Sequence, residues 1–138
     1  MENILIIDRQ PMLRLGMRVI IGAHFQTLSI HEAASISKVS ESLDKPAISV
    51  ILLGLDCESD TLDPEDLISI KKRFPKSRLI IYADQIQHWR ALFKFPKSIA
   101  AFVSKKAHEN ELICCLKSVM NGVRQDWKPA DGPLLEIQ

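Results

Sequence analysis

Five short runs of apolar and β-branched residues recur along the chain and predict five β-strands. They occupy residues 3–7, 25–30, 49–53, 78–82 and 100–104. The first, third and fourth runs are almost continuously apolar, which is typical of strands covered on both faces of a parallel sheet. The second run contains Gln26, Thr27 and Ser29, and this polar character favours a position at an edge of the sheet.

Amphipathic segments fill the intervals between these runs and predict helices. They lie at residues 11–20, 35–43, 63–74, 87–93 and 112–120. Pro11 suits the first turn of its helix, and the Asn-Gly pair at 121–122 suits the end of the last helix. In the second segment, Ile36, Val39 and Leu43 share one helical face. Strand and helix therefore alternate along most of the chain.

This alternation predicts an α/β fold, a (βα)5 flavodoxin-like, doubly wound parallel sheet of five strands in the order 2-1-3-4-5. The order places the polar second strand at an edge, in agreement with its composition. The pattern stops after Gly122. We therefore expect one domain over residues 1–122, followed over 123–138 by a C-terminal tail or the start of an interdomain linker.

Composition narrows the class of protein without naming a function. The chain has 138 residues, enough for one domain with a substantial core. Its net charge of +1 excludes a strong overall attraction to nucleic acid or anionic lipid. The longest apolar runs are too short to cross a bilayer and the first residues lack a secretory signal, so we expect a cytoplasmic protein without a membrane partner.

The usual signatures of catalysis and metal binding are missing from the sequence. Cys57, Cys114 and Cys115 lack the spacing of a zinc site, and we expect them to be reduced thiols. The four histidines are scattered and none is paired with another at helical spacing. Because the chain also lacks a glycine-rich phosphate loop and a nucleophile elbow, we predict neither a metal site nor an enzyme.

Ligands of a doubly wound sheet bind at the carboxyl ends of its strands. Four of the predicted strands are followed there by polar residues or by a glycine. These segments are residues 8–9, 54–56, 83–84 and 105–106. A functional site of this chain is therefore expected along that edge.

Four segments resemble, in order and spacing, the receiver domains of response regulators in the CheY-like superfamily. They are ILIIDRQPMLRLGMRVII, SVILLGL, RLIIYAD and IAAFVSKKAHENELICCLKSVMNG. The resemblance covers about residues 3–122 and points to regulators with a LuxR/NarL-type helix-turn-helix output domain. The first and last segments are most similar to the branch that includes BvgA and EvgA.

The resemblance implies a pocket in which one aspartate accepts a phosphoryl group from a histidine kinase, with a divalent cation to offset the charge. Asp8 matches the first acidic position of that pocket, but Arg9 occupies the second. Gly54 stands where the acceptor aspartate belongs, and Ala83 replaces the residue whose hydroxyl contacts the phosphate. We therefore expect a degenerate phosphorylation pocket, with weak or absent Mg²⁺ binding and no other cofactor.

Two positions keep the residue types of the family. Lys105 matches the lysine of the pocket, and Phe102 matches the aromatic switch position. We expect Lys105 to pair with Asp8, the alternative being a retained surface charge. Arg9 either forms an ion pair with Asp8 or points to solvent. Asp56 offers a displaced acceptor, but an offset of two residues, roughly 6–7 Å along a strand, misplaces an in-line transfer.

The resemblance thus implies a bacterial regulator of two-component signalling and transcription. We expect an atypical receiver that acts by protein–protein contact or dimerisation, without aspartyl phosphorylation. Its partner or second copy is expected on the first and fifth helices, or on the fourth helix, fifth strand and fifth helix. Trp89, Leu92, Phe93 and Phe95 belong either to the core or to that second surface. DNA contact is expected only through an output domain that is not in this chain.

Two alternatives stay open at this point. In the first, the chain is still phosphorylatable through a displaced carboxylate such as Asp56. In the second, it is a stand-alone adaptor that binds a kinase or another regulator. Phosphate transfer distinguishes the first alternative from the atypical receiver. Continuation of the reading frame past Gln138 into a helix-turn-helix distinguishes the second.

Overall fold

Five parallel strands form one sheet in the order β2-β1-β3-β4-β5, as the sequence predicts. The computed structural model describes residues 2–39, 48–56, 64–92 and 99–121. The strands are β1 (Asn3–Ile7), β2 (Ser29–Ala33), β3 (Ile48–Leu55), β4 (Arg78–Ala83) and β5 (Ile99–Ser104). The polar strand β2 lies at an edge, next to β1.

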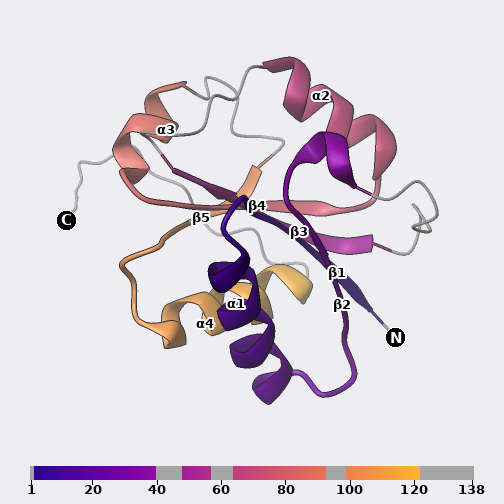
Figure 1. Ribbon diagram of the computed structural model, residues 1–138, viewed down its shortest axis with the longest axis vertical. Helices are drawn as coiled ribbons and strands as arrows, with labels where there is room; N and C mark the ends of the chain where they lie inside the picture. Colours follow the sequence, from indigo (N-terminus) through magenta and orange to yellow (C-terminus); the bar gives the residue numbers. More distant parts are fainter. Residues whose placement is uncertain (1, 40–47, 57–63, 93–98, 122–138) are drawn as a thin grey trace.

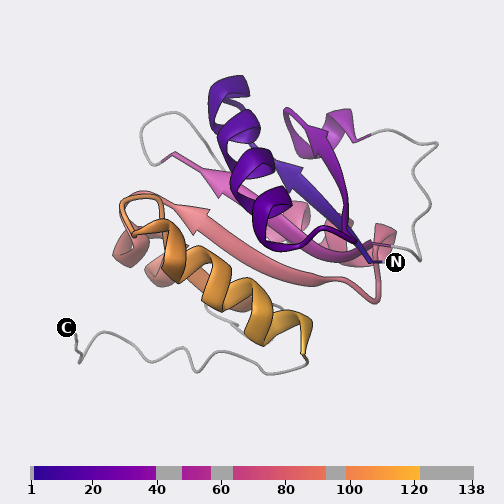
Figure 2. The same cartoon turned by 90° about the horizontal axis from the view of Figure 1, so that it is seen from below.

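Helices cover both faces of this sheet. They are α1 (Pro11–His24), α2 (Pro64–Arg73), α3 (Ile86–Leu92) and α4 (Glu109–Met120), with one 3-10 turn, η1 (Ile36–Lys38). In Figure 1, α2 and α3 lie above the sheet, while α1 and α4 lie below it. Figure 2 shows α1 and α4 side by side on that second face. The chain is therefore a three-layer α/β/α sandwich.

The alternation of side chains along each strand builds two separate cores. On β1, Ile4 and Ile6 pack with α1 and α4, and Leu5 and Ile7 pack with α2 and α3. All four side chains are buried, which explains why this run is apolar without interruption. Trp89 of α3 is 1% exposed, so the core interpretation is correct for this aromatic residue.

The second strand begins and ends later than predicted, at Ser29 and Ala33. The apolar run from Phe25 is used differently, because the Phe25 amide donates to the Ile21 carbonyl and closes the last turn of α1. Leu28 then donates to Phe25 in a turn, and pairing with β1 starts only where Ser29 faces Asn3. The prediction of a strand over 25–30 is therefore wrong in its first residues.

The predicted helix over 35–43 is also wrong where the structure describes it. Only a 3-10 turn forms at Ile36–Lys38, and Val39 has extended dihedral angles, φ −63° and ψ 127°. The hydroxyls of Ser35 and Ser37 bond each other at 3.1 Å, and the Ser35 side chain does not cap the turn. Val39 is buried in the core from this extended position. Residues 40–47 lie outside the described part of the chain.

The remaining sequence predictions for this domain are only partly covered by the structure. The side chain of Leu92, the residues Phe93 and Phe95, and the predicted tail over 123–138 lie outside what is described. Cys114 is exposed and Cys115 is buried, both as free thiols, and burial raises the pKa of the Cys115 thiol to about 11. No helix among the described residues is both long and apolar enough to cross a membrane.

Candidate functional site

Asp8 is the buried charge at the carboxyl edge of the sheet. It follows β1 directly, and only 2% of its surface is exposed. Its amide donates to the Ala33 carbonyl at 3.1 Å, and its Oδ1 accepts a hydrogen bond from the Gln10 amide at 2.8 Å. Its carbonyl accepts from Arg14 Nη1 of α1 at 2.6 Å. Strand β2 and the start of α1 therefore hold Asp8 in one position.

Lys105 supplies the counter-charge for this carboxylate. Its Nζ lies 3.1 Å from Asp8 Oδ2, and its side chain is 15% exposed. Its backbone amide donates to the Ala83 carbonyl at 2.9 Å. This bond extends the pairing of β4 with β5 and fixes the backbone from which the lysine side chain reaches Asp8. Since Oδ2 receives no aligned hydrogen bond from the described residues, the contact is an ion pair. The predicted pairing of Lys105 with Asp8 is confirmed.

Gly54 provides the space that the Asp8 carboxylate occupies. A Cβ atom at position 54 would lie 1.8 Å from Asp8 Oδ2 and 2.7 Å from its Cγ, so no side chain can start there without displacing Asp8. The sequence places Gly54 after the third strand, but it is within β3, opposite Tyr82 of β4. Burial, followed by the nearby charge of Asp8, raises the pKa of the Tyr82 phenol.

A divalent cation, which the receiver resemblance implies, does not fit the residues present. Mg²⁺ requires several oxygen ligands in an octahedral arrangement. Here Asp8 Oδ1 accepts from Gln10, Oδ2 faces Lys105, and the next residue is the cationic Arg9. Within the described part of the chain, no group of three or more histidine, cysteine or acidic residues could hold a metal ion.

The other predicted site residues are distributed around this edge. Ala83 is fully buried at the end of β4 and offers only its carbonyl, and Phe102 is half-buried against the core under α2 and α3. Asp56 follows β3 and is half-buried. Arg9 is exposed and lines a cleft at this edge of the sheet, and its ion pair with Asp8 stays a prediction.

Sequence reasoning missed a clamp between α1 and β2. Glu32 of β2 accepts from Arg14 Nε at 3.1 Å and from Arg18 Nε at 2.6 Å. The hydrogen bond from Arg18 is the largest influence that lowers the pKa of the Glu32 carboxyl. The spacing of the two arginines, one helical turn apart, was the available signal. Because Arg14 also holds the Asp8 carbonyl, the clamp links the site to α1.

A cleft of about 650 Å³ opens at the same edge. Its walls come from the carboxyl ends of β1 and β3, the segment 34–38 that contains η1, and one face of α2. On α2, Asp66, Ser69 and Arg73 are spaced three and four residues apart and line the cleft together. Of the predicted site residues, Asp8, Arg9 and Gly54 line it as well, and Asp56, Ala83, Phe102 and Lys105 do not.

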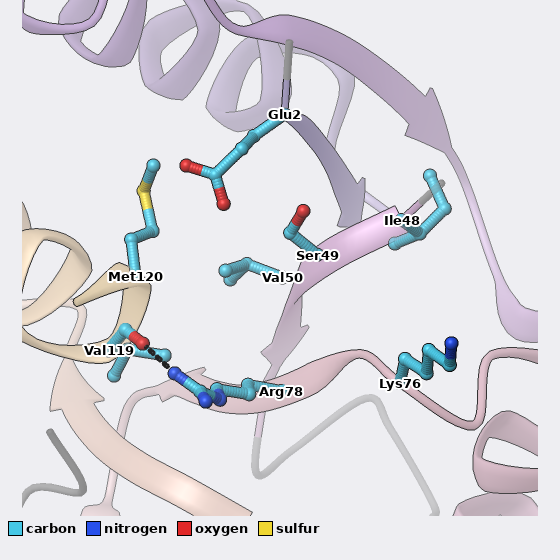
Figure 3. A pocket seen from close by; sticks show the side chains of 8 residues that line it. All are labelled: Glu2, Ile48, Ser49, Val50, Lys76, Arg78, Val119 and Met120. Atoms are coloured by element: carbon cyan, nitrogen blue, oxygen red, sulfur yellow. Dashed lines mark hydrogen bonds between the residues drawn. The ribbon is translucent and has the colours of Figure 1, made fainter. Parts of the chain in front are cut away.

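A smaller cavity of about 230 Å³ lies at the opposite, amino-terminal edge of the sheet. Figure 3 shows the carboxylate of Glu2 on one side of it, and the Arg78 guanidinium donating a hydrogen bond to the Val119 carbonyl on another. This bond satisfies a carbonyl in the last turn of α4, where a cation is favoured by the helix dipole. None of the predicted site residues lines this cavity, and we assign it a structural role.

Comparisons with known proteins agree on the fold. No protein-family model matches the chain, and no curated protein sequence matches it. Solved structures do match it, and three of them share 18% sequence identity with this chain. A LuxR family DNA-binding response regulator from Silicibacter pomeroyi superposes with a TM-score of 0.72, over 89% of this chain and 94% of that chain. A response regulator receiver domain protein from Clostridium thermocellum gives a TM-score of 0.66, over 88% and 96%.

RcsB from Salmonella typhimurium gives a TM-score of 0.71, over 95% of this chain. This chain covers 65% of the length of RcsB. The structural neighbours are thus receiver domains of response regulators, and this chain has the receiver fold.

Proposed function

We propose that this chain is an atypical receiver, a regulatory domain that acts through protein contacts to control transcription without aspartyl phosphorylation and without catalysing a reaction. The observation that carries the proposal is the space at position 54. A glycine stands at the position that the resemblance assigns to the acceptor, and the Asp8 carboxylate lies where a side chain would begin.

The chemistry of phosphoryl transfer supports this proposal. The acceptor and the donor are both negatively charged, so transfer depends on an accessible carboxylate and on a cation that offsets the charge. Asp8 is 2% exposed and held by Gln10 and Lys105, which makes it a poor substitute acceptor. Ala83 offers no hydroxyl to the phosphate. A phosphorylation experiment distinguishes this proposal from the alternative that Asp56 accepts phosphate.

Incubation with acetyl phosphate and Mg²⁺ is expected to leave the intact mass of the chain unchanged. A receiver domain with an acceptor aspartate, treated in parallel, is expected to gain one phosphoryl group and shows that the donor is active. A gain of one phosphoryl group by this chain would refute the proposal. Loss of that gain in an Asp56→Asn variant, but not in Asp8→Asn, would then establish Asp56 as the acceptor.

The exposed apolar residues favour the contact surface expected on the first and fifth predicted helices, which are α1 and α4 of the structure. Met12, Leu15 and Val19 are spaced three and four residues apart on α1 and are 77%, 51% and 63% exposed. Helices α1 and α4, the first and last helices of the fold, are side by side on this face (Figure 2). We therefore propose a second copy of the chain as the occupant of this face. One neighbour, RcsB, has been solved as dimers bound to DNA.

Val19→Glu is expected to weaken self-association by about tenfold or more, because it places a charge in the apolar stripe that dimerisation would bury. Sedimentation velocity over a micromolar concentration series measures the dissociation constant. Ile68→Glu is the matched control, since Ile68 is similarly apolar and 57% exposed but lies on α2, on the other face of the sheet. Equal effects of the two variants, or a wild-type chain that is monomeric throughout, would contradict this interface.

A further inference from the structure

We infer that the cleft between η1 and α2 binds a small organic anion, with a carboxylate or phosphate group at one end and an apolar body. This inference rests on the proposed function, because it names the input that acts in place of covalent phosphate. The cleft lies at the carboxyl edge of the sheet, where open α/β sheets bind their ligands.

The charges around the cleft favour an anion. Arg9, Lys38 and Arg73 line it from three different segments, against the two carboxylates of Asp8 and Asp66. The charge of Asp8 is already offset by Lys105 at 3.1 Å. Among the described residues that line the cleft, the balance of charge is therefore positive, in a chain whose overall net charge is only +1. A concave wall with an excess of cations attracts anions more strongly than a flat surface does.

The uncharged walls define the rest of the ligand. Ser35, Ser37 and Ser69 line the cleft, and a serine hydroxyl can both donate to and accept from a bound group. Apolar side chains, Ile36 of η1 and Leu55 of β3 among them, complete the lining. A volume of about 650 Å³ is that of a typical organic ligand site and far exceeds what an inorganic anion fills. Hence we infer an anion with an apolar body.

The cleft also reaches the elements that the proposed function requires. Arg9 lines it and is adjacent to Asp8, whose carbonyl accepts from Arg14 on α1. The same helix carries the exposed apolar stripe of Met12, Leu15 and Val19. A ligand that contacts Arg9 therefore lies one residue along the chain from Asp8. The hydrogen bond from Arg14 to the Asp8 carbonyl in turn links the site to the proposed dimer face.

Nuclear magnetic resonance of the full chain tests the inference with phenyl phosphate as the probe. Saturable amide shifts are expected at residues 35–38 and 69–73. Inorganic phosphate is expected to bind more weakly because it lacks the apolar body, and benzyl alcohol is expected to produce no saturable shift at these residues. The absence of saturable shifts with phenyl phosphate would overturn the inference. So would equal affinities for phenyl phosphate and inorganic phosphate.

Two lysine variants separate a site from a general attraction to positive charge. Lys38→Gln removes an exposed cation that lines the cleft, and the dissociation constant of phenyl phosphate is expected to rise about tenfold. Lys72→Gln is the matched control, since this exposed lysine of α2 does not line the cleft, and about twofold or less is expected. Equal effects of the two variants would overturn the inference.

The result of this binding experiment can be distinguished from the result of the phosphorylation experiment that tests the proposed function. Non-covalent binding of phenyl phosphate leaves the intact mass of the denatured chain unchanged, whereas transfer from acetyl phosphate adds one phosphoryl group. A gain in mass together with saturable shifts would refute the phosphorylation-independent function and retain the anion site. An unchanged mass without shifts would retain the function and remove this site.

Discussion

Replacement of Lys105 by methionine is expected to lower the free energy of unfolding by about 3 kcal/mol, the largest effect we predict for a single substitution. The variant keeps most of the apolar stem of the lysine but leaves the carboxylate of Asp8, 2% exposed, without its counter-charge. A buried charge that loses an ion-pair partner costs more than the pair itself contributes. Urea denaturation at neutral pH, followed by tryptophan fluorescence, to which the buried Trp89 contributes, measures the change.

The neighbouring lysine provides the control for this prediction. Lys106→Met removes the same charge from an exposed position and is expected to change the free energy of unfolding by about 0.5 kcal/mol or less. The double variant Asp8→Asn with Lys105→Met is expected to recover more than half of the loss, because no buried charge is left. Similar costs at positions 105 and 106 would show that the Asp8–Lys105 pair contributes little.

Gly54→Ala is expected to destabilise the chain by about 2 kcal/mol, although alanine is the better residue for an ordinary strand. The added Cβ would lie 1.8 Å from Asp8 Oδ2, so the carboxylate must leave its place beside Lys105. Urea denaturation measures the loss. In an Asp8→Ala background the cost of Gly54→Ala is expected to fall by more than half, since the carboxylate that meets the new methyl group is gone.

Gly22→Ala is the matched control for this substitution. A Cβ at Gly22 of α1 meets nothing within 4 Å, and alanine is the better helix former by about 1 kcal/mol. The same chemical change is therefore expected to stabilise the chain at position 22 and to destabilise it at position 54. Stabilisation by Gly54→Ala would mean that Asp8 moves aside at little cost, and that the space at Gly54 does not constrain the site.

The layout of the sheet could be predicted because parallel strands buried on both faces consist almost entirely of apolar residues. Strand β1 was predicted with its observed bounds, Asn3–Ile7, for this reason. The polar edge strand β2 carries a weaker signal, and its predicted start at Phe25 fell in the last turn of α1. The segment from Ser35 has an amphipathic spacing, but local serine contacts and the burial of Val39 in an extended conformation override it.

The sequence by itself determined the fold, the edge at which the candidate site lies and the residue types that stand there, and it favoured a pairing of Asp8 with Lys105 without deciding it. These follow from periodicity and from the rule that parallel strands end at one edge, which are properties of order along the chain. Only the tertiary structure showed that the Asp8 carboxylate fills the space at Gly54, and that η1 and α2 enclose a cleft with a positive balance of charge. Both depend on distances between segments far apart in the sequence, and such distances are set by packing.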